Sequence, residues 1–157
     1  MAVQAVPEGH HTVTPQLSIE GAAKAIDFYK QALGAEEIMR APDPSGQKIW
    51  HATLRIGNSL IFVNDVFPEM GPGAEQSRSS LWLYLPDVDA SYKRAVDAGA
   101  TGAMPPADTF WGDRMSVIRD PFGQRWTFAT HVKDMTPEEI KAAEQAFVEE
   151  MKKGAGG

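Results

Sequence analysis

The sequence DPFGQRWTF, residues 120–128, predicts a tight turn that leads directly into a β-strand. Pro121 fixes φ at a value that suits a turn, and Gly123 can adopt the positive φ that other residues avoid. In the strand that follows, Trp126 and Phe128 have the same parity, so both rings lie on one face. We therefore expect a hairpin whose second strand buries two large aromatic side chains.

The outline of this hairpin is present earlier in the chain, at residues 56–62 (IGNSLIF). Gly123 lies 66 residues after Gly57, and the Gly-Ala pair at 99–100 lies 65 residues after the same pair at 34–35. A repeat of this length indicates a duplicated structural unit. Hydrophobic periodicity within each copy predicts the order strand, helix, strand, strand, strand.

The predicted fold is α+β, with two βαβββ modules that form an eight-stranded, incompletely closed sheet around a groove, plus a C-terminal helix. The first module spans residues 12–65 and the second residues 81–132, with a loop rich in Pro and Gly at residues 66–80 between them. A capping box at Thr136 begins the last helix, expected at residues 136–152, whose apolar stripe we expect to dock on the body or on a partner chain. Because each module helix covers one sheet face, the open face is the expected ligand site.

Three finer expectations concern individual strands. The first strand is expected at Thr12–Ile19. The strand Ala100–Met104 is expected to end before a loop at Pro105-Pro106. By simple alternation, Trp50 belongs to the helix-facing core, together with the aromatic pair of the last strand.

Composition restricts the functional class. The chain has 157 residues, 43% of them hydrophobic, and a net charge of −6 with no cysteine. The acidic balance argues against nucleic acid as a partner, and the lack of cysteine excludes disulfides and thiolate chemistry. No apolar stretch approaches the roughly 18 residues that cross a bilayer, and residues 1–11 lack the pattern of a signal peptide. We therefore expect a cytoplasmic protein with no membrane partner.

Several short motifs fall at matching places in the two modules. They are AIDFY at 25–29 and LGA at 33–35 in the first module, and DVDA at 87–90, AGA at 98–100 and DPFG at 120–123 in the second. With the βαβββ duplication, these motifs resemble the vicinal oxygen chelate superfamily, which includes glyoxalase I, bleomycin-resistance proteins and extradiol dioxygenases. FWGDR at 110–114 and ATH at 129–131 resemble its PhnB-like branch. The resemblance covers residues 12–132 and implies a homodimer.

The resemblance also implies where a metal would bind. Metal-dependent members place one ligand on the concave face of the first and fourth strands of each module. The matching positions here are Thr14, Ile61, Ser80 and Thr127. None of them is a His, Asp or Glu, the side chains that divalent cations favour. We therefore expect no metal site and no cofactor.

The alternative is a metal-dependent, glyoxalase-like lyase or isomerase, or a dioxygenase, whose divalent metal is held by displaced ligands. This alternative requires His51, His131 and a carboxylate to converge. The chain contains no nucleophile elbow, P-loop or dinucleotide-binding fingerprint. Whether the protein is an enzyme stays open at this point.

The expected ligand-binding residues are Gln16, His51, Trp82, Tyr84, Trp111, Arg114 and Arg125. Strand parity directs Trp82 and Tyr84 into the groove, where their rings suit a small aromatic or planar ligand. Arg114 and Arg125 can hold a carboxylate or phosphate of that ligand, and His51 can act as a general base. The expected function is metal-independent binding of a sequestration or resistance type. The other interpretation of the two aromatic residues is that they fill the groove or a dimer contact.

Overall fold

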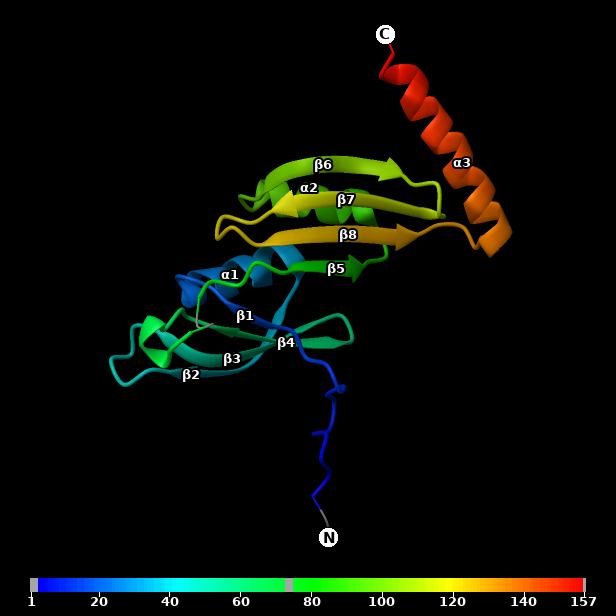
Figure 1. The fold of residues 1–157 in the computed structure, drawn as a ribbon. Helices are drawn as coiled ribbons and strands as arrows, with labels where there is room; N and C mark the ends of the chain where they lie inside the picture. The colour runs from blue at the N-terminus through cyan, green and yellow to red at the C-terminus, as the bar shows by residue number, and fades with distance from the viewer. Residues whose placement is uncertain (1–2, 73–74, 157) are drawn as a thin grey trace.

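The computed structural model describes residues 3–72 and 75–156 as two four-stranded sheets covered by helices (Figure 1). The first sheet has the order β1-β4-β3-β2 and the second the matching order β5-β8-β7-β6. The strands are β1 (Gln16–Ser18), β2 (Glu36–Pro42), β3 (Ile49–Ile56), β4 (Ser59–Asn64), β5 (Ser80–Tyr84), β6 (Thr101–Asp108), β7 (Asp113–Arg119) and β8 (Arg125–His131). In each sheet the first and fourth strands are parallel and the other pairs antiparallel. The α+β class and the duplicated βαβββ order are therefore confirmed.

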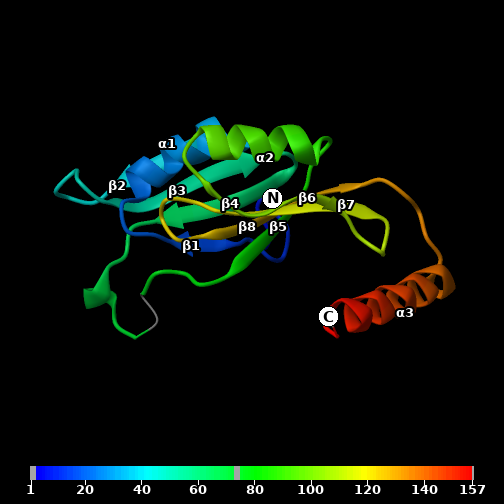
Figure 2. The same ribbon diagram turned by 90° about the horizontal axis from the view of Figure 1, so that it is seen from above.

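Helices α1 (Ala22–Leu33) and α2 (Val88–Asp97) lie side by side on the same side of the two sheets (Figure 2). Asp87 caps α2 as its sequence predicts, because its carboxylate accepts the N–H of Ala90 at 3.0 Å. Gly21 has no side chain with which to cap α1. The carboxylate of Asp65, at the end of β4, accepts the N–H groups of Gly21 and Ala22 instead.

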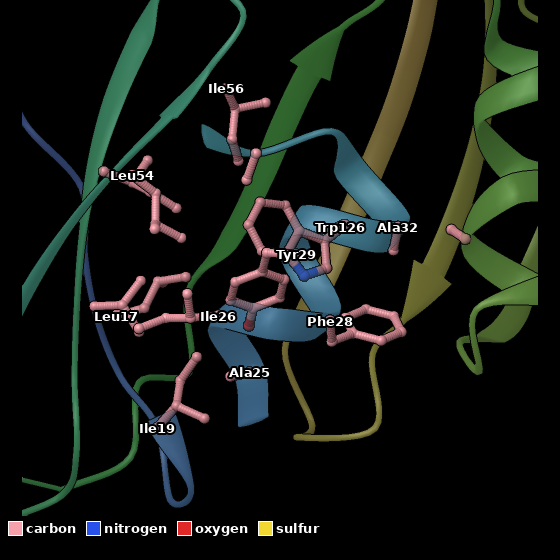
Figure 3. Close-up of a cluster of buried hydrophobic side chains, with 14 of the residues drawn as sticks. Leu17, Ile19, Ala25, Ile26, Phe28, Tyr29, Ala32, Leu54, Ile56 and Trp126 are labelled. Carbon is pink, nitrogen blue, oxygen red and sulfur yellow. The ribbon is translucent and has the colours of Figure 1, made fainter. Parts of the chain in front are cut away.

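The core is continuous across the two modules. Helix α1 buries Ala22, Ala25, Ile26 and Tyr29 against residues of the first sheet such as Leu54 (Figure 3). The ring of Tyr29 also meets Trp126 of the second sheet, with their centroids 5.2 Å apart. Trp126 and Phe128 are fully buried, as alternation in β8 predicts.

A buried carboxylate fixes this junction between the modules. Tyr29 Oη donates to Asp120 Oδ2 at 2.7 Å, and Trp126 Nε1 donates to the same oxygen at 3.0 Å. The other oxygen, Oδ1, accepts the backbone N–H groups of Phe122 and Gln124. The turn at residues 120–123 thus joins α1 of one module to the hairpin of the other.

Two expected strand boundaries are wrong. Strand β1 begins only at Gln16, because Pro15 lacks an N–H group and cannot extend the ladder with β4. Strand β6 continues through Pro105-Pro106 to Asp108. Because β6 is an edge strand, it needs no donors on its outer side, and a register shift between Met104 and Ala107 accommodates the two prolines.

The assignment of Trp50 to the core is also wrong. Ala41 pairs with His51 while Pro42 pairs with Ile49, so Trp50 is the extra residue of a β-bulge. The bulge places Ile49 in the core and leaves the Trp50 side chain 55% exposed.

The last helix, α3 (Pro137–Gly154), has the predicted capping box at Thr136. It extends away from the second sheet (Figures 1 and 2) and none of its residues is buried. Its ring contact is between Phe147 and Phe110, with centroids 5.4 Å apart. The apolar stripe of α3 is therefore not docked along the body. A short 3₁₀ helix, η1 (Pro68–Met70), lies in the loop between the modules. Within the described ranges, none of the helices has the length and apolar character of a membrane span.

Candidate ligand-binding site

The concave face is the sheet face opposite α1 and α2, and strand pairing identifies its residues. Gln16 pairs with Phe62 in the first module, and Trp82 pairs with Thr127 in the second. Phe62, rather than Ile61, faces away from the helices, because Ile61 is buried in the core. The metal-ligand position expected at Ile61 is therefore occupied by Phe62, one residue later. The reason is that the repeat distance is 66 residues between β1 and β5 but 65 between β4 and β8.

A cavity of about 470 Å³ lies between the modules. The first module contributes Pro15 and the β3–β4 hairpin, and the second contributes β5. The lining residues are Pro15, Ile56, Gly57, Asn58, Ser59, Ile61, Leu81, Trp82, Leu83, Tyr84, Leu85 and Trp126. None of these side chains carries a formal charge at neutral pH. Trp82 is 45% exposed and Tyr84 63% exposed, so both rings are open to a ligand.

Tyr84 is held by a hydrogen-bond network at the end of the second sheet. Its hydroxyl donates to Asp113 Oδ2 at 3.0 Å, and Trp111 Nε1 donates to the same atom at 2.9 Å. His131 Nδ1 lies 2.8 Å from Asp113 Oδ1, and its Nε2 lies 2.8 Å from Asp134 Oδ1. The network fixes the loop that carries Trp111 and restricts the ring of Tyr84.

The charges in this network stabilise one another. Burial would raise the pKa of Asp113, but hydrogen bonds from His131, Trp111 and Tyr84 outweigh it and hold the pKa below its usual value. Hydrogen bonds to Asp113 and Asp134 raise the pKa of His131. Sequence reasoning misses Asp113 and Asp134 as site residues, although the FWGDR motif contains Asp113 two residues after Trp111.

The seven predicted ligand-binding residues do not form one site. Trp82, Tyr84 and Trp111 are connected by the cavity and the network just described. Gln16 donates to Asn64 at 2.8 Å and lines a separate cavity of about 910 Å³ that also contains Trp50.

The remaining predicted residues lie elsewhere. His51 lies 3.2 Å from the Thr53 hydroxyl, and its ring meets Phe62. Arg114 is paired with Asp89 and Asp108, which raise its pKa. This arginine is therefore engaged by acidic residues of its own module rather than open to a ligand. Arg125 lines a third cavity, beside Arg119.

Comparison with known proteins identifies the family. The model of the Glyoxalase/Bleomycin resistance protein/Dioxygenase superfamily matches residues 10–128. The chain belongs to this superfamily. An uncharacterised protein of Mycobacterium tuberculosis (strain H37Rv) is 39% identical over 150 residues, which cover 91% of this chain and 85% of the relative. An uncharacterised Arabidopsis thaliana protein is 32% identical over 124 residues, covering 73% and 74% of the two chains.

Solved structures share the fold. TioX from Micromonospora sp. ML1 has a TM-score of 0.62 and 25% identity, and the match covers 80% of this chain and 100% of TioX. A superfamily member from Sphaerobacter thermophilus has a TM-score of 0.61 at 23% identity, covering 76% and 96%. These two likenesses support the fold rather than a particular activity.

The concave-face residues do not fit the divalent metal that many superfamily members bind. With Ile61 replaced by Phe62, the four expected positions hold Thr14, Phe62, Ser80 and Thr127: three hydroxyls and a phenyl ring. Such a set lacks the imidazole and carboxylate donors that hold Zn²⁺ or Fe²⁺. Within residues 3–72 and 75–156, no group of three His, Cys, Asp or Glu side chains is placed to hold a metal ion.

Proposed function

We propose that this protein binds a small, planar, uncharged molecule in the cavity between its modules, without the help of a divalent metal. The proposal depends on one observation above all. The exposed rings of Trp82 and Tyr84 line a cavity of about 470 Å³ that contains no charged side chain. That volume lies within the roughly 300–1,000 Å³ of typical small-molecule sites.

The chemistry of the cavity supports an aromatic ligand. A ring stacked on an indole or phenol gains about 0.5–1.5 kcal/mol beyond the burial of apolar area. Tyr84 is already positioned by Asp113, so binding costs little ordering of that side chain. A ligand of about 20 non-hydrogen atoms, at about −0.3 kcal/mol per atom, would bind with a Kd of tens of micromolar.

The experiment compares two tryptophans. We would titrate a panel of uncharged two- and three-ring aromatic compounds and follow the intrinsic fluorescence of wild-type protein, Trp82→Ala and Trp50→Ala. The two side chains are similarly exposed but line different cavities. We expect Trp82→Ala to weaken binding at least tenfold and to change the free energy of unfolding by less than about 1 kcal/mol. Trp50→Ala should bind normally. Loss of binding only in Trp50→Ala would move the site to the larger cavity and contradict the proposal.

We assign the chain to the PhnB-like branch on the resemblance of its FWGDR motif, whose Trp111 and Asp113 also build the network that holds Tyr84. A metal-dependent lyase, isomerase or dioxygenase is less well supported. The two displaced ligands that it would need make separate contacts: His51 meets Thr53 and Phe62, whereas both ring nitrogens of His131 lie against Asp113 and Asp134.

A homodimer also remains part of this proposal. Two-fold dimers are the commonest oligomers, and the apolar residues Phe147, Val148 and Met151 of α3 are exposed in the single chain. Light scattering coupled to size-exclusion chromatography measures the mass directly. A mass of one chain at micromolar concentration would remove the dimer from the proposal.

A further inference from the structure

Three of the seven arginines of the chain gather in one place. Arg78, Arg119 and Arg125 line a cavity of about 480 Å³ beside the hairpin at residues 120–124. No ion pair recorded among residues 3–72 and 75–156 includes any of the three.

The other four arginines have partners on the protein. Arg40 pairs with Glu37, Arg55 with Glu36, and Arg114 with Asp89 and Asp108, while Arg94 donates to the carbonyl of Gln31. The cluster is therefore an exception within a chain of net charge −6, in which carboxylates outnumber basic side chains.

The backbone forces two of these charges together. Arg119 and Arg125 are direct cross-strand partners in the antiparallel pair β7–β8, so their side chains leave the sheet on the same face. Cβ atoms at such positions are about 4.5–5.5 Å apart, and like charges there are destabilising. A bound anion would convert this repulsion into two attractive contacts.

The third arginine is positioned by contacts between the inter-module loop and the hairpin. Gln76 Nε2 donates to the carbonyl of Phe122 at 2.6 Å and attaches the loop to the hairpin. The Ser77 hydroxyl accepts the N–H of Ser18 at 2.9 Å, so its own proton is free to donate. Ser77 and Ser79 line the cavity as neutral groups, and Glu75 is its single acidic side chain.

We propose that the cavity formed by Arg78, Arg119 and Arg125 binds the phosphate group, or another doubly charged oxyanion, of a small molecule. Guanidinium groups match such oxyanions in planar, paired hydrogen bonds. Three positive charges against Glu75 leave an excess of two, which suits a dianion. A long polyanion is disfavoured, because the acidic surface outside the cavity repels it.

The anion site is independent of the aromatic cavity in its chemistry, although the two are close. Arg125 lies two residues before Thr127 on the same face of β8, and Thr127 pairs with Trp82. Two strand residues span about 6.6 Å. One ligand with an aromatic part and a phosphate could therefore reach both places, but phosphate alone tests the anion site.

The experiment measures the melting temperature in sodium phosphate and sodium pyrophosphate against sodium chloride at equal ionic strength. Wild-type protein should be stabilised by both anions. Arg119→Gln should melt at the same temperature as wild type or higher without phosphate, because it removes the repulsion, yet weaken phosphate binding at least tenfold. Arg78→Gln should also weaken binding at least tenfold. Arg55→Gln, an exposed arginine of the other module, is the matched control and should respond as wild type does.

Each outcome bears on the site. Equal phosphate stabilisation of wild type and Arg119→Gln would overturn it, as would an equal loss in Arg55→Gln. A single-stranded oligonucleotide that binds as tightly as pyrophosphate would overturn the assignment to a small molecule. Trp82→Ala should leave the phosphate effect unchanged, so failure of the aromatic site and failure of the anion site are distinguishable.

Discussion

Replacing Tyr29 with Phe should destabilise the protein by removing one hydrogen bond at the junction of the modules. The Tyr29 side chain is fully buried, and its hydroxyl donates to Asp120 at 2.7 Å. Burial and the nearby Asp120 carboxylate raise the pKa of Tyr29, so the hydroxyl stays neutral and remains a donor. A hydrogen bond to a charged group contributes about 1.5–3 kcal/mol.

The lower part of that range applies to Tyr29→Phe. Asp120 keeps Trp126 Nε1 and two backbone N–H groups as donors, so the carboxylate is not left without partners. We expect a loss of about 2 kcal/mol in the free energy of unfolding. For a domain of this size, 1 kcal/mol corresponds to about 2–4 °C, so the melting temperature should fall by about 4–8 °C.

Tyr84→Phe is the matched control, because Tyr84 also donates its hydroxyl to an aspartate. Tyr84 is 63% exposed, so water replaces the lost contact and the cost should stay below about 1 kcal/mol. Urea unfolding followed by circular dichroism measures both variants. Equal losses, or a loss below about 0.5 kcal/mol in Tyr29→Phe, would refute the role given to this buried hydrogen bond.

Three other predictions follow from the site and the tail. Contacts with Asp113 and Asp134 raise the pKa of His131, so its contribution to stability is complete below about pH 6.5 and is lost as pH rises through the raised pKa. In His131→Asn the melting temperature should therefore fall less between about pH 6.5 and 8 than in wild type, and an unchanged slope in a calorimetric pH series would contradict the assignment. Deleting α3 from Pro137 onward should lower the melting temperature by less than about 2 °C, because the helix buries no residue; a larger fall would mean that α3 packs against another copy in solution. EDTA should leave the melting temperature of freshly purified protein unchanged, because no group of three His, Cys, Asp or Glu side chains among the described residues is placed to hold a metal ion; a fall of several degrees would contradict this.

The sequence predicted the elements well where local chemistry determines them. The cap of α2 at Asp87, the capping box at Thr136 and the buried faces of α1 and β8 follow from residue type and spacing alone. The duplication was visible because glycine turns repeat at nearly constant distance. These features depend on residues close together in the chain.

The errors arise where strand pairing overrides local pattern. Trp50 alternates with core residues in the sequence, but a bulge turns it outward. A constant repeat distance predicts Ile61 on the concave face, but the distance changes by one residue between the strand pairs.

The composition of the site could not be predicted for a similar reason. Arg114 pairs with Asp89, 25 residues earlier in the chain, and Arg119 lines the same cavity as Arg78 of the inter-module loop. Neither arrangement leaves a periodic signal. Trp82 and Tyr84, by contrast, occupy a regular strand, and parity placed them correctly on the exposed face of β5.

Binding of an aromatic ligand without a metal is tested most directly by measuring one affinity under two conditions. The compound that binds best in the fluorescence titration would be titrated into protein treated with EDTA, and again after addition of Ni²⁺, Zn²⁺, Mn²⁺ or Fe²⁺. We predict the same Kd in EDTA and with each metal, because Thr14, Phe62, Ser80 and Thr127 offer no imidazole or carboxylate donor for a divalent cation. Loss of binding in EDTA, restored by one of these metals at one ion per chain, would contradict the proposal and make the metal-dependent enzyme the better account.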